Sequence, residues 1–281
     1  MTNNNSRELV IRSINISEEK GTIKRPVESS EVTSEGLKED AHSGPWHRQI
    51  SMMSAESIRN FNNREGRNIE FGEFAENITI EGMDLTNVGI FDRFRGKNFE
   101  LEVTQIGKKC HGDGCAIYRE VGKCAMPKEG IFCRVVRTGN IQMGDKVEYV
   151  PATIRAWVIT VSDRVSKGIY EDKSGKLIAG ELEDYFSKTA KRSALERKVI
   201  PDDPQQLSEL IKKAKEENID YIFTTGGTGI GSRDIAPETL TPFIDKELPG
   251  IMDMVRVKYG KDNPNALLSR SVAGVSGKTL I

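Results

Sequence analysis

Four polar or glycine-rich motifs of the C-terminal half share one position: three directly follow a short apolar run, and the fourth comes soon after. They are Ser162-Asp163-Arg164, Pro201-Asp202-Asp203, Gly226-Gly227-Thr228-Gly229 and Arg233-Asp234. Consecutive glycine amides can approach an anion closely and form a concave anion site. Carboxylates beside a phosphate would repel it unless a hard divalent cation lies between them. The pattern therefore predicts a site for a phosphate-bearing ligand together with Mg²⁺.

The glycine-rich turn does not match either of two common phosphate-binding motifs. The dinucleotide-binding fingerprint would need a glycine where Ser232 stands, and the P-loop would need a lysine that this loop lacks, so both fail. A tight turn without function remains an alternative for the glycines alone. Carboxylates at strand ends are often helix caps, a role that fits Asp203 better than Asp202 and barely fits Asp234.

Strands and helices that would position these motifs alternate along the C-terminal half. Strands are predicted at Ala156–Val161, where a continuous apolar run indicates burial on both faces, before Pro201, and at Tyr221–Thr225. Between them lie one helix with an apolar stripe of Ile178, Leu182, Tyr185 and Phe186, and another that begins at Asp203-Pro204 and carries Leu207, Leu210, Ile211 and Ala214. This alternation predicts an α/β domain with a mainly parallel, doubly wound sheet, in which ligands bind beyond the carboxyl ends of the strands.

The N-terminal half has the period of half-buried strands instead. Phe99, Leu101 and Val103 alternate with polar residues, and similar runs occur at Leu9–Ile16, Asn77–Ile80, Ile131–Val136 and Lys146–Val150. A short helix is predicted near Ser54–Phe61, with Ser54 as N-cap. Many short strands with irregular loops predict a mostly β domain, a barrel or a sandwich. We therefore expect a polar tail at residues 1–7, a β domain at 8–151 and an α/β domain at 155–281.

Composition limits the classes of function. A chain of 281 residues, 37% hydrophobic and 30% charged, is long enough for two globular domains of ordinary size. The formal net charge of −1 provides no global field to attract nucleic acid or an anionic membrane. The polar N-terminus lacks the apolar region of an export signal, and no apolar run approaches the ~18 residues of a membrane span. We expect a cytoplasmic protein that uses neither nucleic acid nor membrane as a partner.

The ordered motifs of the C-terminal half resemble the molybdopterin adenylyltransferase family, the MogA/MoaB-like fold shared with gephyrin. The matching strings are Val161-Ser162-Asp163-Arg164, Ile200-Pro201-Asp202, Thr224-Thr225-Gly226-Gly227-Thr228-Gly229, Arg233-Asp234-Ile235-Ala236-Pro237-Glu238, Glu247-Leu248-Pro249-Gly250 and Leu268-Ser269-Arg270. The resemblance covers about Ala156 to Ile281. It implies transfer of AMP from ATP to molybdopterin with release of pyrophosphate and use of Mg²⁺, in a homotrimer formed through this domain, with a downstream molybdenum-insertion protein as partner.

The resemblance carries over residue by residue. Asp202 and Asp234 fall on the family's catalytic carboxylates and are implied as ligands of Mg²⁺. The residues implied to bind substrate or nucleotide are Ser162, Asp163, Thr225, Gly226, Gly227, Thr228, Gly229 and Ser269. The family continues after its last strand with an Asn-Leu-Pro-Gly loop and a final helix, whereas this sequence stops at Ile281. We therefore expect the natural chain to continue with a further loop and helix.

The N-terminal half is similar to a MOSC domain, the β-rich module also found at the end of molybdenum cofactor sulfurases. The strings that carry this likeness are Ser13-Ile14-Asn15-Ile16-Ser17, Asp40-Ala41-His42-Ser43-Gly44, Phe74-Ala75-Glu76-Asn77-Ile78-Thr79 and the Cys110 region, within about Glu8 to Val150. The resemblance implies that one cysteine carries sulfur or contacts the cofactor, and Cys110 is the closest match.

Cysteines and histidines of this half could support thiol or metal chemistry. The four cysteines are Cys110, Cys115, Cys124 and Cys133, which we expect to be reduced thiols in a chain without an export signal. Cys110-His111 with Cys115 could bind a borderline metal, but the spacing is no recognised zinc pattern and free thiols are favoured. Neighbouring lysines predict Cys110 as the most reactive thiol, and Cys133 as a core residue. His42 and His47 are expected to have structural roles.

Two other functions compete with the enzyme. In a binding module, both domains would hold or deliver molybdopterin without adenylating it; the presence of both Asp202 and Asp234 favours the enzyme, because binding alone would not need two carboxylates beside an anion. A nicotinamide-dependent reductase is disfavoured by the failed dinucleotide fingerprint.

Overall fold

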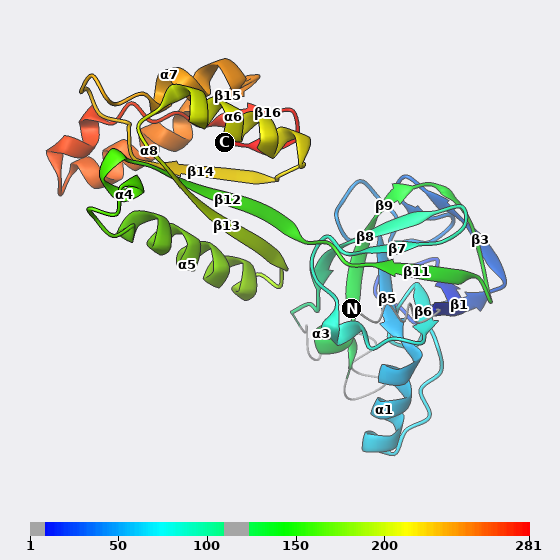
Figure 1. Cartoon of the computed structure of the whole chain (residues 1–281). Helices are drawn as coiled ribbons and strands as arrows, with labels where there is room; N and C mark the ends of the chain where they lie inside the picture. Colours follow the sequence, from blue (N-terminus) through cyan, green and yellow to red (C-terminus); the bar gives the residue numbers. More distant parts are fainter. Residues whose placement is uncertain (1–8, 110–123) are drawn as a thin grey trace, which may run out of the picture. The chain divides into compact units, whose positions relative to one another are not determined.

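The computed structural model describes residues 9–109 and 124–281. The chain divides into two compact units, Met1–Ala152 and Thr153–Ile281 (Figure 1). Cys110, His111 and Cys115 lie outside the described residues, so the predictions that concern them stay predictions. No helix of the described residues is long and apolar enough to cross a membrane.

Seven strands of the first unit form a closed ring. They are β1 (Leu9–Ile16), β5 (Ile50–Ser54), β6 (Ile78–Glu81), β7 (Arg93–Arg95), β8 (Glu100–Ile106), β9 (Ile131–Arg137) and β11 (Lys146–Val150). Their order is β11-β7-β8-β9-β5-β6-β1, and β11 pairs again with β1, which closes the ring. β5 and β6 pair in parallel, and the other neighbours in this ring pair antiparallel. Of the two β architectures that the sequence allowed, the molecule has the barrel.

The described residues of this unit also form smaller elements. β2 (Arg25–Val27) pairs with the end of β1, and β10 (Gly139–Gln142), β3 (Ser29–Thr33) and β4 (Gly36–Leu37) form a separate three-stranded sheet. A helical turn η1 (Leu85–Asn87) and the short helix α3 (Met126–Glu129) lie in its loops. Helix α1 (Ala55–Glu65) begins where predicted, because the Ser54 hydroxyl accepts the N–H of Ser57.

Apolar side chains fill the barrel. Its fully buried members include Ile14, Ile50, Phe94, Leu101 and Cys133. The prediction that Cys133 is a core residue is therefore confirmed, and burial raises the pKa of its thiol. A second cluster of apolar side chains, Met53, Ile58, Phe61, Phe74 and Phe132 among them, packs α1 against the barrel.

The second unit contains a six-stranded mixed sheet. Its strands are β12 (Ile154–Val161), β13 (Ser193–Ile200), β14 (Tyr221–Thr225), β15 (Lys246–Glu247), β16 (Gly274–Ser276) and β17 (Thr279–Leu280), in the order β13-β12-β14-β17-β16-β15. The first four of this order run parallel, whereas β16 is antiparallel to β17 and to β15. The prediction of a mainly parallel sheet is confirmed for those four strands, and the antiparallel pairings of β15 and β16 are an addition that the sequence did not predict. β15 and β16, of two and three residues, are too short to leave a periodic signal.

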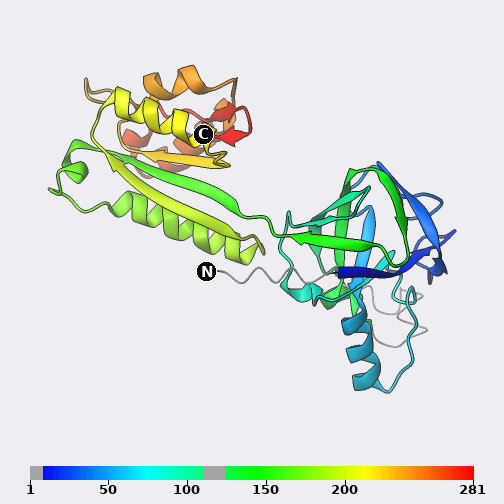
Figure 2. The ribbon, with the colours of Figure 1, turned by 45° about the vertical axis from the view of Figure 1, so that its right-hand side comes forward.

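Helices cover both faces of this sheet. α5 (Lys173–Lys188) follows β12 and α6 (Pro204–Glu216) follows β13, and the two lie on opposite faces (Figures 1 and 2). Opposite faces are expected, because the chain steps from β12 to β13 in one direction and from β13 past β12 to β14 in the other, through right-handed crossovers. All residues of β12 except Arg155 are buried, as its apolar run predicts.

The remaining helices lie in the segments that connect the strands. α4 (Asp163–Ser166) follows β12 directly, and α7 (Ala236–Leu240) leads into the turn η3 (Thr241–Phe243). α8 (Pro249–Gly260) and η4 (Pro264–Leu268) precede the last two strands. One part of the helix prediction is wrong: Tyr185 of α5 is 56% exposed, and Gly175, Ala179 and Phe186 are the residues buried on that helix.

Candidate functional site

A cleft of about 540 Å³ lies at the carboxyl ends of β12, β13 and β14. The register brings these ends together, since Val161 pairs with Ile200 and Thr160 with Thr225. Seven of the residues predicted to form the site line this cleft: Ser162, Asp163, Asp202, Thr225, Gly226, Gly227 and Asp234. Thus motifs up to 72 residues apart in sequence lie on one concave surface.

Asp163 and Asp202 form two reciprocal hydrogen bonds, in each of which the backbone N–H of one residue donates to the carboxylate of the other. The N–H of Asp163 donates to Oδ2 of Asp202 at 3.0 Å, and the N–H of Asp202 donates to Oδ1 of Asp163 at 3.2 Å. The guanidinium of Arg233 pairs with the other oxygen of Asp163. These donors offset the repulsion between two adjacent carboxylates and cross-link the loops after β12 and β13.

The glycine-rich loop is shaped by close backbone approaches. Gly226 has φ +93°, and a Cβ there would lie 2.1 Å from the carbonyl oxygen of Val161. A Cβ on Gly229 would lie 2.7 Å from Oδ2 of Asp234. Among the described residues, the N–H groups of Gly227, Thr228 and Gly229 donate to no acceptor. Packing alone therefore explains some of these glycines, while the unpaired amides are what an anion site requires.

Asp234 is fixed by the turn that follows this loop. Its Oδ2 accepts the N–H of Gly231 at 2.8 Å, and its own N–H donates to the carbonyl of Gly231 at 3.0 Å. Asp234 also borders a second hollow of about 860 Å³. Its other lining residues come from α6, α7, η3 and the adjoining loops: Pro204, Ser208, Lys212, Ile230, Gly231, Ser232, Ile235, Glu238, Thr239, Pro242, Phe243 and Arg270. Asp234 is thus shared by two neighbouring concavities.

Three predicted residues do not line the cleft. Thr228 borders a separate cavity of about 230 Å³ lined mainly by apolar residues of the sheet, α7 and α8. The hydroxyl of Ser269 donates to that of Thr228 at 3.3 Å, so these two lie together beside the cleft. Gly229 lies against Asp234.

Asp172 lines the cleft although the sequence did not predict it there. Its Oδ1 accepts the N–H of Gly175 at 2.9 Å and the hydroxyl of Thr160 at 3.0 Å, and its Oδ2 pairs with Arg197 at 3.3 Å. It is the N-cap of α5. The cap signal was available in Asp172-Lys173-Ser174, but the apolar stripe that identified the helix begins only at Ile178.

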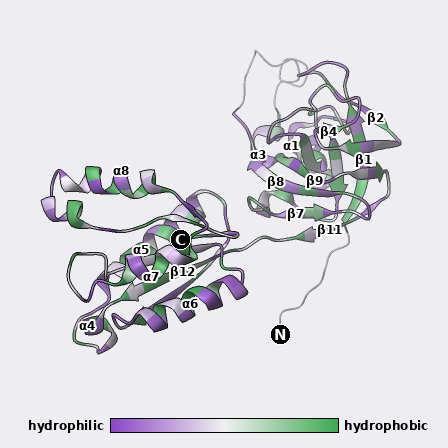
Figure 3. Cartoon of the chain, turned by 90° about the horizontal axis from the view of Figure 1, so that it is seen from above, coloured by the Kyte–Doolittle hydropathy of each residue, from purple (hydrophilic) through white to green (hydrophobic). Residues whose placement is uncertain are grey.

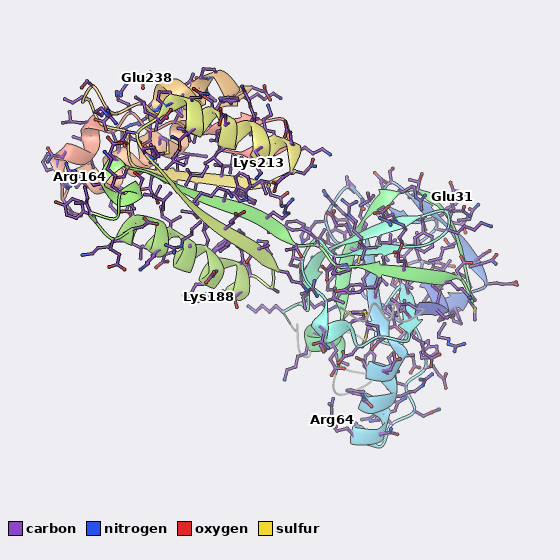
Figure 4. All side chains as sticks on the ribbon, viewed as in Figure 1. Glu31, Arg64, Arg164, Lys188, Lys213 and Glu238 are labelled. Atoms are coloured by element: carbon purple, nitrogen blue, oxygen red, sulfur yellow. The ribbon has the colours of Figure 1, made fainter. Side chains whose placement is uncertain are left out.

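Carboxylates outnumber cations in the cleft. Its acidic residues are Asp163, Glu171, Asp172, Asp202 and Asp234, and its basic residues are Arg164, Lys173 and Arg233. Figure 4 shows Arg164 on α4 and Glu238, which borders the second hollow, on α7. A polyphosphate would be repelled from such a lining unless it arrived with a divalent cation.

The side chains present fit a magnesium ion shared with phosphate. Among the described residues no group of three His, Cys, Asp or Glu side chains is placed to hold a metal. However, Oδ1 of Asp202 and Oδ1 of Asp234 have no hydrogen-bond partner among them, since the bonds to both side chains use Oδ2. Mg²⁺ is commonly held by one or two carboxylates together with substrate phosphates and water.

The motif residues of the barrel unit form a buried polar network. Lys24, 3% exposed, pairs with the fully buried carboxylate of Asp40. Nδ2 of Asn77 donates to Asp40 at 2.9 Å and to the carbonyl of Asn15 at 3.2 Å. Glu76 accepts the N–H of Gly72, and its complete burial raises its pKa to about 7. These polar residues connect β1, β6 and their loops.

His42 and His47, which were predicted to be structural, take part in local contacts. The ring of His42 packs against Trp46 with centroids 4.9 Å apart. Burial, followed by the positive charge of Lys24, lowers the pKa of His42 to about 4, so it is neutral at pH 7. The ring of His47 hydrogen-bonds the side chain of Gln105 at 3.2 Å.

Each half of the chain matches a known protein family. Residues 39–148 match the MOSC domain, and residues 157–281 match a family described as "Probable molybdopterin binding domain". Over 130 residues the chain is 39% identical to the molybdopterin adenylyltransferase of Helicobacter pylori strain J99, covering 46% of this chain and 72% of that protein. It is 38% identical to molybdenum cofactor biosynthesis protein B of Staphylococcus carnosus, covering 46% and 74%.

A solved structure of the tungsten cofactor synthesizing protein MoaB from Pyrococcus furiosus is also similar. It is 35% identical with a TM-score of 0.40, and the match covers 47% of this chain and 80% of that chain. From the sequence matches, the chain belongs to the molybdopterin adenylyltransferase family of molybdenum cofactor biosynthesis proteins, here joined to an N-terminal MOSC domain.

Proposed function

We propose that the α/β domain transfers AMP from ATP to molybdopterin and releases pyrophosphate. The observation that carries this proposal is the convergence of Asp202 and Asp234, from two different strand-end loops, on one cleft with Gly226 and Gly227. The activity named for the Helicobacter pylori relative supports it. Two carboxylates beside an anion site are what phosphoryl-group chemistry with a metal needs, and what simple anion binding would avoid.

The two concavities that share Asp234 suggest one place for each substrate. The cleft, with its excess of carboxylates, suits ATP bound together with Mg²⁺, and the phosphates of ATP would lie near Asp202 and Ser162. The second hollow presents Lys212 and Arg270 beside apolar residues such as Phe243, a lining that suits a heterocycle with an anionic tail. The two phosphates would then meet at Asp234.

In the reaction, an oxygen of the terminal phosphate of molybdopterin attacks the α-phosphorus of ATP. The bond from that phosphorus to the oxygen bridging the α- and β-phosphates breaks, and pyrophosphate leaves. Bound Mg²⁺ supplies positive charge to the phosphate oxygens. Asp202 and Asp234 would hold the ion through their Oδ1 atoms, which have no partner among the described residues, and the unpaired amides of Gly227 to Gly229 would donate to a phosphate. Arg233, which pairs with Asp163 at the cleft, adds a positive charge that offsets part of the charge on the phosphates.

We further propose that the domain forms a homotrimer and that α8 contributes to the interface. None of the residues of α8 is buried, and Ile251, Met254, Val255, Val257 and Tyr259 are between 40% and 72% exposed. Figure 3 shows hydrophobic stretches alternating with hydrophilic ones along α8. An exposed apolar surface of this kind is typical of an interface between subunits.

The MOSC domain is proposed to act on the same cofactor, by binding it or by carrying sulfur on Cys110. Support comes from the presence of both domains in one chain. Delivery of the product to a downstream molybdenum-insertion protein completes the proposed role, in the cytoplasm.

The test uses the full chain with molybdopterin, ATP and Mg²⁺, and measures pyrophosphate release. Release that depends on molybdopterin supports adenylyl transfer. Stoichiometric molybdopterin binding without any pyrophosphate would instead establish the binding and delivery module.

A further inference from the structure

Arg270 connects segments of the site that are far apart in sequence. Its backbone N–H donates to the carbonyl oxygen of Thr228 at 2.8 Å, and its Nε donates to that of Gly229 at 2.7 Å. Its Nη2 donates to the carbonyl oxygen of Asp234 at 2.9 Å. The remaining arm, Nη1, pairs with the carboxylate of Glu238. One residue therefore contacts the glycine-rich loop, the segment that carries Asp234, and α7.

These contacts determine where nearby amides point. A trans peptide group is planar, with its C=O and the following N–H on opposite sides. When the carbonyls of Thr228 and Gly229 turn toward Arg270, the N–H groups of Gly229 and Ile230 turn away from it. Neither of these two N–H groups donates to an acceptor among the described residues. Arg270 thus presets the direction of donors that are free to meet an anion.

Only the guanidinium can make this set of contacts. Its donors form a rigid planar fork, so Nε and Nη2 reach two carbonyls at once, whereas a lysine offers a single ammonium group on a flexible stem. The pair with Glu238 contributes little to stability, because the two side chains are 38% and 61% exposed. The bonds to Gly229 and Asp234 are partly buried and are the ones that hold the loop.

Arg256 holds the other side of the same segment. Its Nη1 donates to the carbonyl oxygens of Ser269 and Ser271, both at 3.1 Å. The backbone on either side of Arg270 is therefore held in place. The side chain of Arg270 extends from this fixed backbone to the glycine-rich loop.

We propose that Arg270 is a positioning residue for adenylyl transfer, which holds the amides of Gly229 and Ile230 and the backbone of Asp234 in the geometry that receives the phosphates. This inference rests on the proposed function and deepens it. Its effect on the reaction passes through the loop. Loss of the fork should therefore impair the chemical step more than ground-state binding of ATP.

The experiment compares Arg270→Lys with Arg137→Lys in the full chain. Arg137 is a matched control in the barrel unit, because its Nη2 likewise donates to backbone carbonyls, those of Gly96, Lys97 and Phe99. Amide hydrogen exchange of Gly231, Asp234 and Ala236, whose N–H groups are hydrogen-bonded within this loop, is measured without substrates. It is measured alongside kcat, KM for ATP and the thermal midpoint of each variant.

We expect Arg270→Lys to speed exchange of these three loop amides and to lower kcat about 10- to 100-fold, with KM for ATP changed less than about threefold. Arg137→Lys should leave both the loop exchange and kcat as in the unaltered chain. The inference is overturned if Arg270→Lys leaves exchange and kcat unchanged, or if kcat falls only in proportion to the folded fraction.

Failure of the proposed function would look different. An unaltered chain that releases no pyrophosphate in the presence of molybdopterin would reject adenylyl transfer. The loop exchange, which needs no substrate, would still test Arg270: an Arg270→Lys variant with unchanged loop exchange would contradict the positioning role.

Discussion

Replacing Asp234 by Asn separates charge from shape at the centre of the proposed site. Asn keeps an oxygen that can accept the N–H of Gly231, a bond of 2.8 Å in the unaltered chain, so the turn before Asp234 should persist. What the substitution removes is the negative charge on Oδ1, the oxygen that has no partner among the described residues. Asp202→Asn makes the same change on the neighbouring loop, where Oδ2 accepts the N–H of Asp163.

The size of the expected fall in kcat follows from the role of such a carboxylate in the reaction. Loss of one preorganised electrostatic element lowers kcat by about 10² to 10³, equivalent to about 3–4 kcal/mol of transition-state stabilisation. Affinity for molybdopterin should change little, because a carboxylate offers no attraction to that anion in the ground state. We therefore expect either variant to lose turnover at least about a hundredfold while pterin binding is retained.

Pyrophosphate release and molybdopterin affinity are measured side by side on the same preparations. Asp203→Asn is the matched control: Asp203 is the neighbour of Asp202, but its Oδ1 caps α6 by accepting the N–H groups of Gln205 and Gln206. Asn is an equally good N-cap, so this variant should be almost silent. Wild-type turnover in both Asp202→Asn and Asp234→Asn would refute the catalytic assignment and leave the binding module in its place.

Three further predictions concern the loop, the barrel and the proposed interface. Gly226→Ala should destabilise the α/β unit by more than about 2 kcal/mol in urea denaturation, because its Cβ would clash with the carbonyl of Val161 and its φ is positive. The control is Gly180→Ala, at a position on α5 where a Cβ would meet no other atom. This variant should stabilise the unit by about 0.5–1 kcal/mol. Glu76, with its pKa raised from 4.5 to about 7, stays protonated in the folded chain while the unfolded chain ionises, so the free energy of unfolding should fall by about 3 kcal/mol as the pH rises from 4.5 to above 7. Glu76→Gln should abolish that fall in denaturation curves at pH 5 and pH 8, and an equal fall in both proteins would contradict the assignment. Met254→Lys, a change at a side chain 72% exposed on α8, should convert the proposed trimer to monomer in light scattering, and a monomeric unaltered chain would reject the interface.

Elements with a strong periodic signal could be predicted closely. β1, β11, β14 and the start of α6 lie where the sequence places them, because each has several apolar residues in register or an unambiguous cap such as Asp203-Pro204. Closure of the barrel could not be predicted in this way. Closure depends on the pairing of Leu9 with Val147, which are 138 residues apart. A pairing over this separation produces no signal in the local sequence.

The candidate site likewise contains residues that the sequence could place and residues that it could not. Asp163, Asp202 and Gly226 could be placed together, because parallel strands end at one edge of the sheet whatever their separation in sequence. Asp172 could not, since it reaches the cleft by capping a helix rather than by ending a strand. The position of Ser269 beside Thr228, outside the cleft, depends on the irregular chain after η4, for which no periodic rule applies.

Glycine substitutions cannot decide between a structural and a functional role for the loop, whereas charge substitutions can. Gly226 is required by its close approach to Val161, and Gly229 by its approach to Asp234, whether or not an anion ever binds there. A loss of activity in Gly226→Ala would therefore follow from disruption of the fold alone. Asp234→Asn leaves those approaches intact and changes only the charge presented to the cleft, and Arg270→Lys alters the direction of the amides while every glycine stays in place. The functional interpretation of the loop therefore depends on these two variants, each of which removes something that packing alone does not require.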